Sequence, residues 1–552
     1  MFDESRIIFH NIEYFYKGDF QFDLLQLNPS CLVAIQMHRN PELLFFITYL
    51  FKKKIPFLMI DPAYPEDRIR YMLENSKATI HITDNFTMRY LNEHKDTNSW
   101  SDTAYVIYTS GTTGNPKGVI ITRDALFNFV KGISEIIDFS SEKKIACLTT
   151  VSFDIIFLES IMALSKGLTV VLASEEEQYN PKLMAKLIQK NNVDMIQMTP
   201  STMQLLLNYD KELSCLKDVK EIMIGGEPFP FSLLQILQKK TTAKIYNMYG
   251  PTETTIWSAV SDLTCKKRID IGHPIKNTEI YIVDKNLCIL PNGQTGEICI
   301  AGQGLAKGYL DRDDLTTEKF VYLPQKPNVR VYRTGDLGRY LSDGDLEYLG
   351  RTDNQVKIRG HRIELEEIEA NLNQFEGINQ SIVIVIETSK TDKVLKAFYT
   401  SDNHIETKDI ISNLSQKLPD YMIPAIFKRV ENFIYTGNGK IDRKKVFQCV
   451  EIREEKSLSK DWNTTELNDT QAKIFQVIVS NLNSEIGDVS LGTFLSDVGI
   501  DSITFIKMIV ALEGEFGFEF DDEMLLITSF PTIKSMIKYV ETKIDISRQT
   551  LK

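Results

Sequence analysis

Short apolar runs alternate with amphipathic stretches along the first 250 residues of the chain. Continuous apolar runs are typical of buried strands, and they occur at residues 32–35, 55–60, 79–83, 105–108, 169–172, 195–198 and 222–227. Between them, Asn40-Pro41 opens a helical stretch to about residue 53, because proline fits the first turn of a helix. Further helices are expected at 66–75, 183–189 and 230–239. Strands alternating with helices at this spacing predict parallel βαβ units, whereas residues 1–30 carry few signals.

The pattern changes beyond residue 250. Residues 269–350 contain short strands broken by Gly, Asn and Asp, which predicts a β-rich region. A polar, charged tract at 451–465 buries little and is typical of a linker. The stretch that follows is helical in pattern and holds thirteen acids against five bases between 466 and 543, a net charge of about -8. We therefore expect domains at 1–352, 353–447 and 466–545, with a linker at 448–465.

Composition narrows the class of protein. The 552 residues are 43% hydrophobic and 25% charged, the balance of a protein with a buried core. A net charge of -12 argues against nucleic acid or an anionic membrane as a partner. Seven scattered cysteines without a C-x-x-C pair indicate free thiols. No stretch has signal-peptide character and no apolar run approaches 18 residues, so we expect a cytoplasmic protein.

A loop rich in glycine and hydroxyl groups follows the strand at 105–108. Its candidate phosphate-binding residues are Thr109, Ser110, Gly111, Thr112, Thr113, Gly114 and Lys117. Glycines let backbone N–H groups approach a ligand, the hydroxyls add donors, and the lysine adds a positive charge. No Gly-Lys pair is followed by Ser or Thr in the frame of the common ATPase P-loop. The alternative is a flexible surface turn.

This loop resembles the phosphate loop of the adenylate-forming enzymes, which include acyl-CoA synthetases, luciferases and the adenylation domains of nonribosomal peptide synthetases. The piece from Ile55 to Thr83 also resembles an early core motif of peptide-synthetase adenylation domains. The resemblance implies a multidomain α/β plus β-rich fold with a large N-terminal and a small C-terminal lobe. Compared with the family, the N-terminal lobe looks shortened by several tens of residues.

The run Tyr246–Thr254 contains the family's YGPTE motif. The resemblance implies that Tyr249 stacks on adenine, Asn247 reads the adenine amino edge and Thr252 touches phosphate. It also implies that Glu253 helps to hold Mg²⁺, a metal that binds through one or two carboxylates plus phosphates. A turn without a role is the alternative.

Two further motifs match the family. In Tyr332–Leu337 the resemblance makes Asp336 the acceptor for both ribose hydroxyls, and it adds Arg351 as a ribose contact and Asp353 as the hinge of the small lobe. In Thr436–Lys444 it makes Lys440 the catalytic lysine. A cation there stabilises charge as a carboxylate attacks the α-phosphate of ATP. A surface ion pair for Arg351 and Asp353 and a solvated Lys440 are the alternatives.

A candidate amino-acid pocket begins at Asp154. The resemblance places a carboxylate at this position to receive the α-ammonium of an amino acid, and a partly buried carboxylate needs such a cationic partner. The other wall positions are Ile155, Leu158, Gln197, Met223, Gly225, Met248, Ile256 and Trp257. Trp257, Met248 and Gln197 are expected to fill the space of a substrate side chain, as in glycine-selecting pockets. Alanine is the natural competitor, since one methyl group is worth only ~1–3 kcal/mol.

Gly499–Ile503 resembles the attachment site of carrier domains, in which Ser502 bears 4′-phosphopantetheine. Ser502 stands where a helix is expected to begin, because apolar residues recur at helical spacing after it. The surrounding residues fit an all-α four-helix carrier domain. Gly-Ile-Asp-Ser replaces the usual Gly-Gly-Asp-Ser, which leaves the downstream partner open, and a simple helix cap is the alternative for Ser502.

Together these motifs identify the chain as resembling an adenylation domain fused to a peptidyl carrier domain. The implied function is ATP- and Mg²⁺-dependent activation of a small amino acid, glycine first, and its transfer to the carrier thiol. Rival hypotheses are alanine as substrate, a free acyl- or aryl-activating ligase, a P-loop ATPase and a non-catalytic interaction protein. The implied partners are a phosphopantetheinyl transferase and a condensation or other carrier-accepting enzyme on another chain. Dependence on a small MbtH-like protein stays open.

Overall fold

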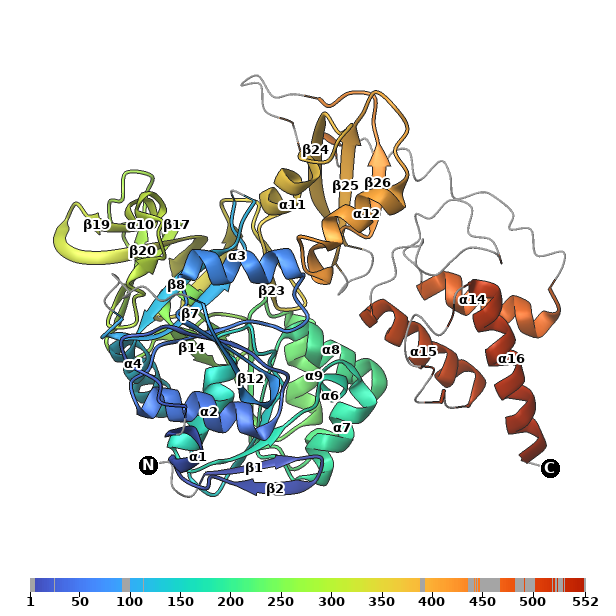
Figure 1. The fold of residues 1–552 in the computed structure, drawn as a ribbon, viewed down its shortest axis with the longest axis horizontal. Coiled ribbons are helices and arrows are strands. Elements are labelled where there is room, and N and C mark those ends of the chain that lie inside the picture. Colours follow the sequence, from blue (N-terminus) through green and yellow to red (C-terminus); the bar gives the residue numbers. More distant parts are fainter. Residues whose placement is uncertain are drawn as a thin grey trace. The chain divides into compact units, whose positions relative to one another are not determined.

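The computed structural model divides the chain into two compact units, Met1–Glu364 and Leu365–Lys552 (Figure 1). It describes residues 5–23, 25–91, 100–112, 114–387, 393–434, 441, 443, 445–446, 467–481, 491, 502–518, 520–521, 524, 530 and 532–550. The first unit contains every described candidate site residue except Ser502. Each unit is described by itself.

A nine-stranded sheet forms the centre of the first unit, in the order β15-β14-β13-β12-β11-β9-β10-β1-β2. Its six inner strands from β13 to β1 run parallel, and β14, β15 and β2 are antiparallel additions. The strands are β1 (Arg6–Phe9), β2 (Ile12–Phe15), β9 (Lys144–Cys147), β10 (Thr169–Leu172), β11 (Met195–Met198), β12 (Glu221–Gly225), β13 (Lys244–Tyr249), β14 (Ala259–Asp262) and β15 (His273–Pro274). The buried runs therefore make a parallel sheet, as their continuous hydrophobicity predicts.

Helices cover one face of this sheet and gather on one side of the first unit in Figure 1. They are α6 (Glu175–Tyr179), α7 (Pro181–Lys190), α8 (Pro200–Tyr209) and α9 (Phe231–Lys240). Their starts follow local rules. Ser174 and Glu177 form a capping box at α6, and the Asn180 side chain accepts from the first backbone N–H groups of α7. The apolar sides of α7, α8 and α9 share one buried cluster with β11 and β12.

A seven-stranded sheet carries the phosphate-loop candidate, in the order β18-β8-β7-β4-β3-β5-β6. Its strands are β3 (Val33–Gln36), β4 (Phe57–Met59), β5 (Ile80–Thr83), β6 (Thr87–Tyr90), β7 (Thr103–Thr109), β8 (Lys117–Thr122) and β18 (Gly308–Tyr309). The nearby helices are α1 (Phe20–Asp23), α2 (Pro41–Lys52), α3 (Glu66–Ser76), α4 (Arg123–Ser134) and α5 (Ala163–Ser165), with a π-helical turn η2 at Leu158–Met162. Strands β7 and β8 form an antiparallel hairpin, and the candidate loop joins them.

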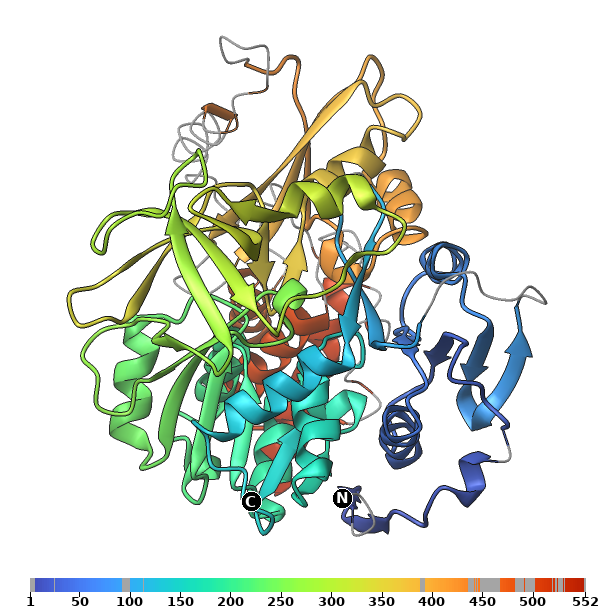
Figure 2. The same cartoon turned by 90° about the vertical axis from the view of Figure 1, so that its left-hand side faces the viewer.

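The β-rich region is confirmed as a five-stranded antiparallel sheet. It contains β16 (Thr278–Val283), β17 (Gly296–Gly302), β19 (Phe320–Leu323), β20 (Lys326–Tyr340) and β21 (Leu346–Arg351), with α10 (Asp313–Lys319) before β19. Figure 2 shows its strands in lime green to yellow. A hairpin of β22 (Val356–Ile358) and β23 (His361–Ile363) completes the first unit.

The second unit contains a three-stranded sheet and a set of helices. Strands β24 (Gln380–Glu387), β25 (Lys393–Thr400) and β26 (Ile426–Arg429) are accompanied by α11 (Leu365–Leu372) and α12 (Thr407–Ser415). The carrier region shows α14 (Asp469–Asn481), α15 (Ser502–Phe516) and α16 (Ile533–Thr550), which share one apolar cluster. These helices agree with the helical pattern expected for residues 466–545.

Most strand and helix predictions in the first unit are confirmed within two residues of their ends. Two features differ from expectation. The first thirty residues form β1, β2 and α1, and the chain after β7 returns antiparallel in β8 where continued parallel alternation was expected. No helix among the described residues is long and apolar enough to cross a membrane. The domain limits at 352 and 447 stay predictions.

Candidate functional site

The backbone conformation of the loop after β7 requires glycine at two positions, Gly111 and Gly114. A β-carbon on Gly111 would lie 2.2 Å from the backbone oxygen of Asn115, and Gly114 has φ +87°. The Ser110 hydroxyl donates to the backbone oxygen of Arg362 at 2.9 Å. Thr109 Oγ1 is buried without a hydrogen-bond partner among the described residues. The loop is therefore tightly turned and presents an unused hydroxyl, whereas Thr113 lies outside the described residues.

Glu253 lies close enough to the cations Arg362 and Lys117 for both to act on its charge. Glu253 is fully buried on the short turn Thr252–Thr254 that follows β13. It accepts from both its neighbours, Tyr309 Oη at 2.8 Å and Arg362 Nη1 at 3.0 and 2.8 Å. Burial would raise the pKa of Glu253, but the cations Arg362 and Lys117 outweigh it and lower that pKa to about 2. Glu253 is thus an ionised carboxylate at the end of a parallel sheet, where ligands bind in such folds.

Lys117 is itself enclosed. Only 7% of its side chain is exposed, and its Nζ lies 3.5 Å from Glu364 and over the ring of Tyr309. Burial lowers the pKa of Lys117, and the nearby Arg362 lowers it further. A cation held at this cost in solvation suits a site that receives an anion.

The donor set suits a metal that shares its ligands with phosphate. Within the described residues, no group of three or more His, Cys, Asp or Glu side chains could hold an ion by itself. Mg²⁺ normally binds through one or two carboxylates plus phosphates and water, so the single ionised Glu253 fits it. In this structure Arg362 holds that carboxylate.

Tyr249, Asp336, Arg351 and Asp353 form a second cluster. Tyr249 Oη donates to Asp336 Oδ2 at 2.6 Å, and Arg351 Nη1 donates to Asp336 Oδ1 at 2.7 Å. Arg351 also donates from Nε and Nη2 to the two oxygens of Asp353, each at 2.7 Å. Burial and Asp336 raise the pKa of Tyr249 well above its ordinary value. The structure therefore brings together three of the four residues expected near a ribose and an adenine, Tyr249, Asp336 and Arg351.

Asp154 is the pocket candidate with an ionisable side chain, and one of its carboxylate oxygens lacks a hydrogen-bond partner among the described residues. The side chain is 7% exposed, and the oxygen concerned, Oδ2, is buried. Burial raises the pKa of Asp154 to about 6, against an opposing hydrogen bond from Thr252. A buried, unpaired carboxylate oxygen is an unfavourable arrangement unless a cationic ligand satisfies it.

Four of the remaining wall candidates, Gln197, Met223, Gly225 and Met248, lie on three neighbouring strands. Gln197, Met223 and Tyr246 are neighbours in register on β11, β12 and β13, and Gly225 pairs with Met248 one step further. A β-carbon on Gly225 would lie 2.7 Å from Trp257 Cη2, so the indole occupies the space beside this glycine. Apart from Ile155, which is partly buried, the wall side chains are buried: Leu158, Gln197, Met223, Met248, Ile256 and Trp257.

Three residues with contacts at the site were not among the candidates of the sequence analysis. Arg362 pairs with Glu253, Glu159 accepts from Thr149 Oγ1 at 2.7 Å, and Glu227 accepts from Ser201 Oγ at 2.6 Å. Glu227 also accepts from the backbone N–H of Gly360, which ties the β22–β23 hairpin to the site. Arg362 and Glu227 lie 109 and 26 residues from these partners, and Glu159 stands inside an apolar run, so no local motif marks them. The basic run 357–362 is the visible signal for Arg362.

Two candidates in the second unit are only partly described. Lys440 lies outside the described residues, but Arg443 donates from Nη1 to Val383 O at 2.6 Å and from Nη2 to Glu369 at 2.8 Å. The segment after Lys440 is therefore anchored to β24 and α11. The backbone of Ser502 opens α15, which confirms the expected helix start.

Comparisons with known proteins identify the relatives of this chain. Residues 86–310 match the family model described as AMP-binding enzyme, and residues 472–540 match the phosphopantetheine attachment site. The "Dimodular nonribosomal peptide synthase" of Bacillus subtilis (strain 168) is 39% identical over 446 residues, which is 76% of this chain. The chain spans only 19% of the length of that relative.

Two solved structures are informative. A nonribosomal peptide synthetase protein containing adenylation and carrier domains, bound to a vinylsulfonamide inhibitor, superposes with a TM-score of 0.79 at 21% identity. The match covers 98% of this chain and 94% of that chain, and it confirms the expected fold class. A four-domain nonribosomal peptide synthetase bound to AMP and glycine gives a TM-score of 0.58 at 27% identity, over 98% of this chain and 42% of that one.

Proposed function

Because this chain belongs to the AMP-binding enzymes and joins an adenylation domain to a phosphopantetheine-bearing carrier domain, we propose that it activates a small amino acid as aminoacyl-AMP and loads it on its own carrier. Enzymes of this class use ATP and Mg²⁺. The amino acid carboxylate attacks the α-phosphorus of ATP, and pyrophosphate leaves. When bound, 4′-phosphopantetheine supplies the thiol that takes the aminoacyl group and releases AMP.

The observation that carries an amino acid substrate is the unpaired Oδ2 of Asp154. A substrate ammonium would give this buried carboxylate its missing partner, and a simple acyl or aryl acid would not. This argument separates amino acid activation from the rival acyl- or aryl-activating ligase. Ile155 and Leu158 continue the same wall beside Asp154.

Glycine is the proposed amino acid because the pocket beyond Asp154 is already filled. Trp257 packs against Gly225, and Gln197, Met223, Met248 and Ile256 are buried around it. The four-domain relative was solved with AMP and glycine, which supports the same choice. Alanine differs by one methyl group and is the expected second substrate.

The other site residues receive these proposed roles. Thr109, Ser110, Gly111, Thr112, Thr113, Gly114 and Lys117 contact the phosphates of ATP, together with Thr252. Tyr249 stacks on adenine, Asn247 reads its amino edge, and Asp336 with Arg351 holds the ribose. Glu253 is the proposed ligand of Mg²⁺, which neutralises phosphate charge. Lys440 is the proposed catalytic cation, Asp353 the hinge of the small lobe, and Ser502 the attachment point of the carrier arm.

Amino-acid-dependent exchange of pyrophosphate into ATP tests the proposal. We expect exchange with glycine, weaker exchange with alanine and little with large amino acids. Lys440→Ala should lose exchange while the chain stays folded. Ser502→Ala should retain exchange but fail to accept a pantetheine group from a phosphopantetheinyl transferase. Exchange with a large amino acid in preference to glycine would contradict the proposed substrate, and exchange with none of the amino acids would contradict the activity.

A further inference from the structure

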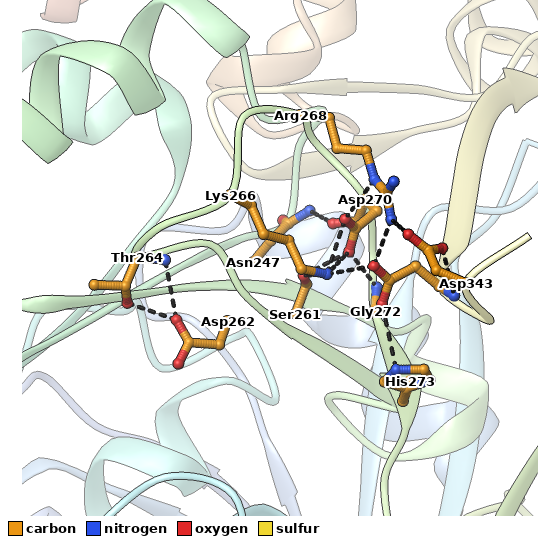
Figure 3. A network of polar contacts seen from close by, with 11 residues as sticks. Asn247, Ser261, Asp262, Thr264, Lys266, Arg268, Asp270, Gly272, His273 and Asp343 are labelled. Atoms are coloured by element: carbon orange, nitrogen blue, oxygen red, sulfur yellow. Dashed lines mark hydrogen bonds and ion pairs between the residues drawn. The ribbon is translucent and has the colours of Figure 1, made fainter. Parts of the chain in front are cut away.

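The side-chain amide of Asn247 is fixed by a backbone group on another segment. Its Nδ2 donates to the backbone oxygen of Asp270 at 2.7 Å, in a buried position (Figure 3). A carbonyl oxygen can only accept, so the amide nitrogen must face Asp270. The Oδ1 of Asn247 is therefore turned the other way, and no donor among the described residues reaches it. An amide held in this orientation presents an acceptor only.

Asp270 is fixed in turn by hydrogen bonds to its own carboxylate, and its side chain is fully buried. Ser261 Oγ donates to Asp270 Oδ1 at 2.5 Å, and the backbone N–H of Gly272 donates to the same oxygen at 3.0 Å. Ser261 is the cross-strand neighbour of Asn247 in the pairing of β13 with β14. Asp270 therefore accepts from both members of one cross-strand pair, from Asn247 with its carbonyl oxygen and from Ser261 with its carboxylate.

Two cations close the network around Asp270. Lys266 Nζ donates to both carboxylate oxygens at 2.9 and 3.0 Å, and Arg268 Nε donates to Oδ2 at 3.3 Å. The same two side chains donate to Asp345, in the turn between β20 and β21, at 2.6 Å each. Figure 3 shows the side chains of Lys266 and Arg268 reaching the carboxylate of Asp270.

The backbone around Asp270 leaves little freedom for adjustment. Gly272 has φ +66°, and a β-carbon there would lie 2.1 Å from the backbone oxygen of Val260. Ile271 N–H donates to Leu346 O, and Leu346 N–H donates to Gly272 O. The segment that carries the Asp270 carbonyl is therefore fixed on both sides.

We propose that Asp270 is a positioning residue for nucleotide selection, which holds the Asn247 amide so that its Oδ1 accepts from the 6-amino group of adenine. This inference rests on the proposed function, in which Asn247 faces the adenine edge. An amide free to turn would offer its nitrogen as often as its oxygen and would lose the preference for an amino group over an oxo group. Lys266 and Arg268 act through Asp270 and do not touch the nucleotide.

The test compares binding of Mg²⁺-ATP and Mg²⁺-ITP to the full chain by titration calorimetry without amino acid. ITP carries an oxo group where ATP carries the 6-amino group. We expect Asn247→Ala to remove the preference for ATP. Asp270→Asn should raise the Kd for ATP about fivefold, the size of one hydrogen bond, and leave the Kd for ITP within about twofold. The double variant should match Asn247→Ala alone.

Asp262→Asn is the matched control, because Asp262 lies on the same strand as Ser261 but its side chain, within the part of the chain that the structure describes, accepts hydrogen bonds from Thr264 alone. It should leave both Kd values unchanged. Lys266→Gln, at a side chain that is 30% exposed, should move the ATP-to-ITP ratio in the same direction and keeps the test valid if Asp270→Asn does not fold. Two outcomes would overturn this inference and leave the proposed function standing. In the first, the unaltered chain prefers ATP and neither Asp270→Asn nor Lys266→Gln changes that preference. In the second, the variants weaken the binding of ATP and ITP equally. No ATP binding by the unaltered chain would overturn the proposed function with it.

Discussion

A β-carbon built on Gly225 would lie 2.7 Å from Cη2 of Trp257 and 2.7 Å from the backbone oxygen of Met248. The two residues are complementary, because the missing side chain of one makes room for the indole of the other. Trp257 is 2% exposed, so this contact is part of the core as well as the end of the proposed pocket.

Trp257→Leu should widen the range of amino acids that support pyrophosphate exchange. The smaller side chain vacates space beside Gly225, so the preference for glycine over leucine should fall by about tenfold or more, as expected when several carbon atoms of room are added. The measurement is the exchange rate over a panel of amino acids.

Trp100→Leu is the control for lost core packing, since Trp100 is 3% exposed in a different apolar cluster. It should lower thermal stability and leave the order of substrates unchanged. An unchanged order in Trp257→Leu would mean that the pocket lies elsewhere.

Asp154 should make amino acid binding dependent on pH. Burial raises its pKa to about 6, so the empty pocket holds a neutral carboxyl below that pH and a carboxylate above it. The KM for glycine should therefore rise as pH falls below about 6. Asp154→Asn should weaken glycine binding and remove this inflection, while ATP binding stays intact. Equal inflections in both proteins would assign the titration to another group.

Glu159 should make stability dependent on pH. Its carboxylate accepts from the backbone N–H groups of Leu148 and Thr149 at 2.9 Å, yet burial raises its pKa to about 7. The folded state then binds the proton more tightly than the unfolded state, whose pKa is near 4.5. The stabilising effect of this proton is complete below 4.5 and is lost as pH rises through 7.

Glu159→Gln should therefore flatten the loss of unfolding free energy between pH 5 and 8, measured by urea denaturation. Glu159→Ala should destabilise at every pH by about 1–3 kcal/mol for each buried donor left unpaired. In the orientation that pairs both its amide nitrogen and its amide oxygen, Gln197 donates to Glu159 Oε1 at 3.0 Å and accepts from the backbone N–H of Met198. The alanine variant should for that reason also raise the KM for glycine. A stability profile that keeps its slope in Glu159→Gln would exclude this group as the source.

Arg362 should compete with Mg²⁺ for Glu253. The guanidinium makes two contacts to the carboxylate, and a metal ion needs the same oxygens. Arg362→Gln should lower the Mg²⁺ concentration for half-maximal ATP binding by about tenfold, equivalent to ~1.4 kcal/mol. Arg339→Ala removes an arginine that pairs with Glu347 instead, and it should have no such effect. A higher Mg²⁺ requirement in Arg362→Gln would show that the arginine assists the metal.

The sequence predicted what depends on neighbours along the chain. The runs Thr169–Leu172 and Met195–Met198 are strands at the expected residues because every side chain in them is buried. Glycines in the loop after β7 and the helix start at Ser502 also follow from local rules. The pairing of β1 with β10 joins Arg6 to Thr169, and no local pattern encodes a contact between segments so far apart.

The site was predicted as a set of residues and not as a network. Motifs predict Asp154, Glu253, Asp336 and Arg351 as site residues, whereas no motif points to Arg362, Glu159 or Asp270. Each of these three acts on a residue that is distant in sequence or through its backbone, as when the Asp270 carbonyl holds Asn247. Glu159 stands inside an apolar run, and the sequence does not show that it is buried. Its burial is favourable only because the fold brings Thr149 beside it as a hydrogen-bond donor.

The stretch 362–364 at the end of the first unit contacts three residues that are proposed to bind the nucleotide or its metal ion. Ser110 donates to the backbone of Arg362, Glu253 accepts from its side chain, and Lys117 faces Glu364 two residues later. A hydroxyl, an anion and a cation are thus engaged by one stretch of three residues. Binding of a triphosphate would therefore displace one short stretch of chain from three partners, and a structure of the chain with Mg²⁺-ATP should show all three contacts broken.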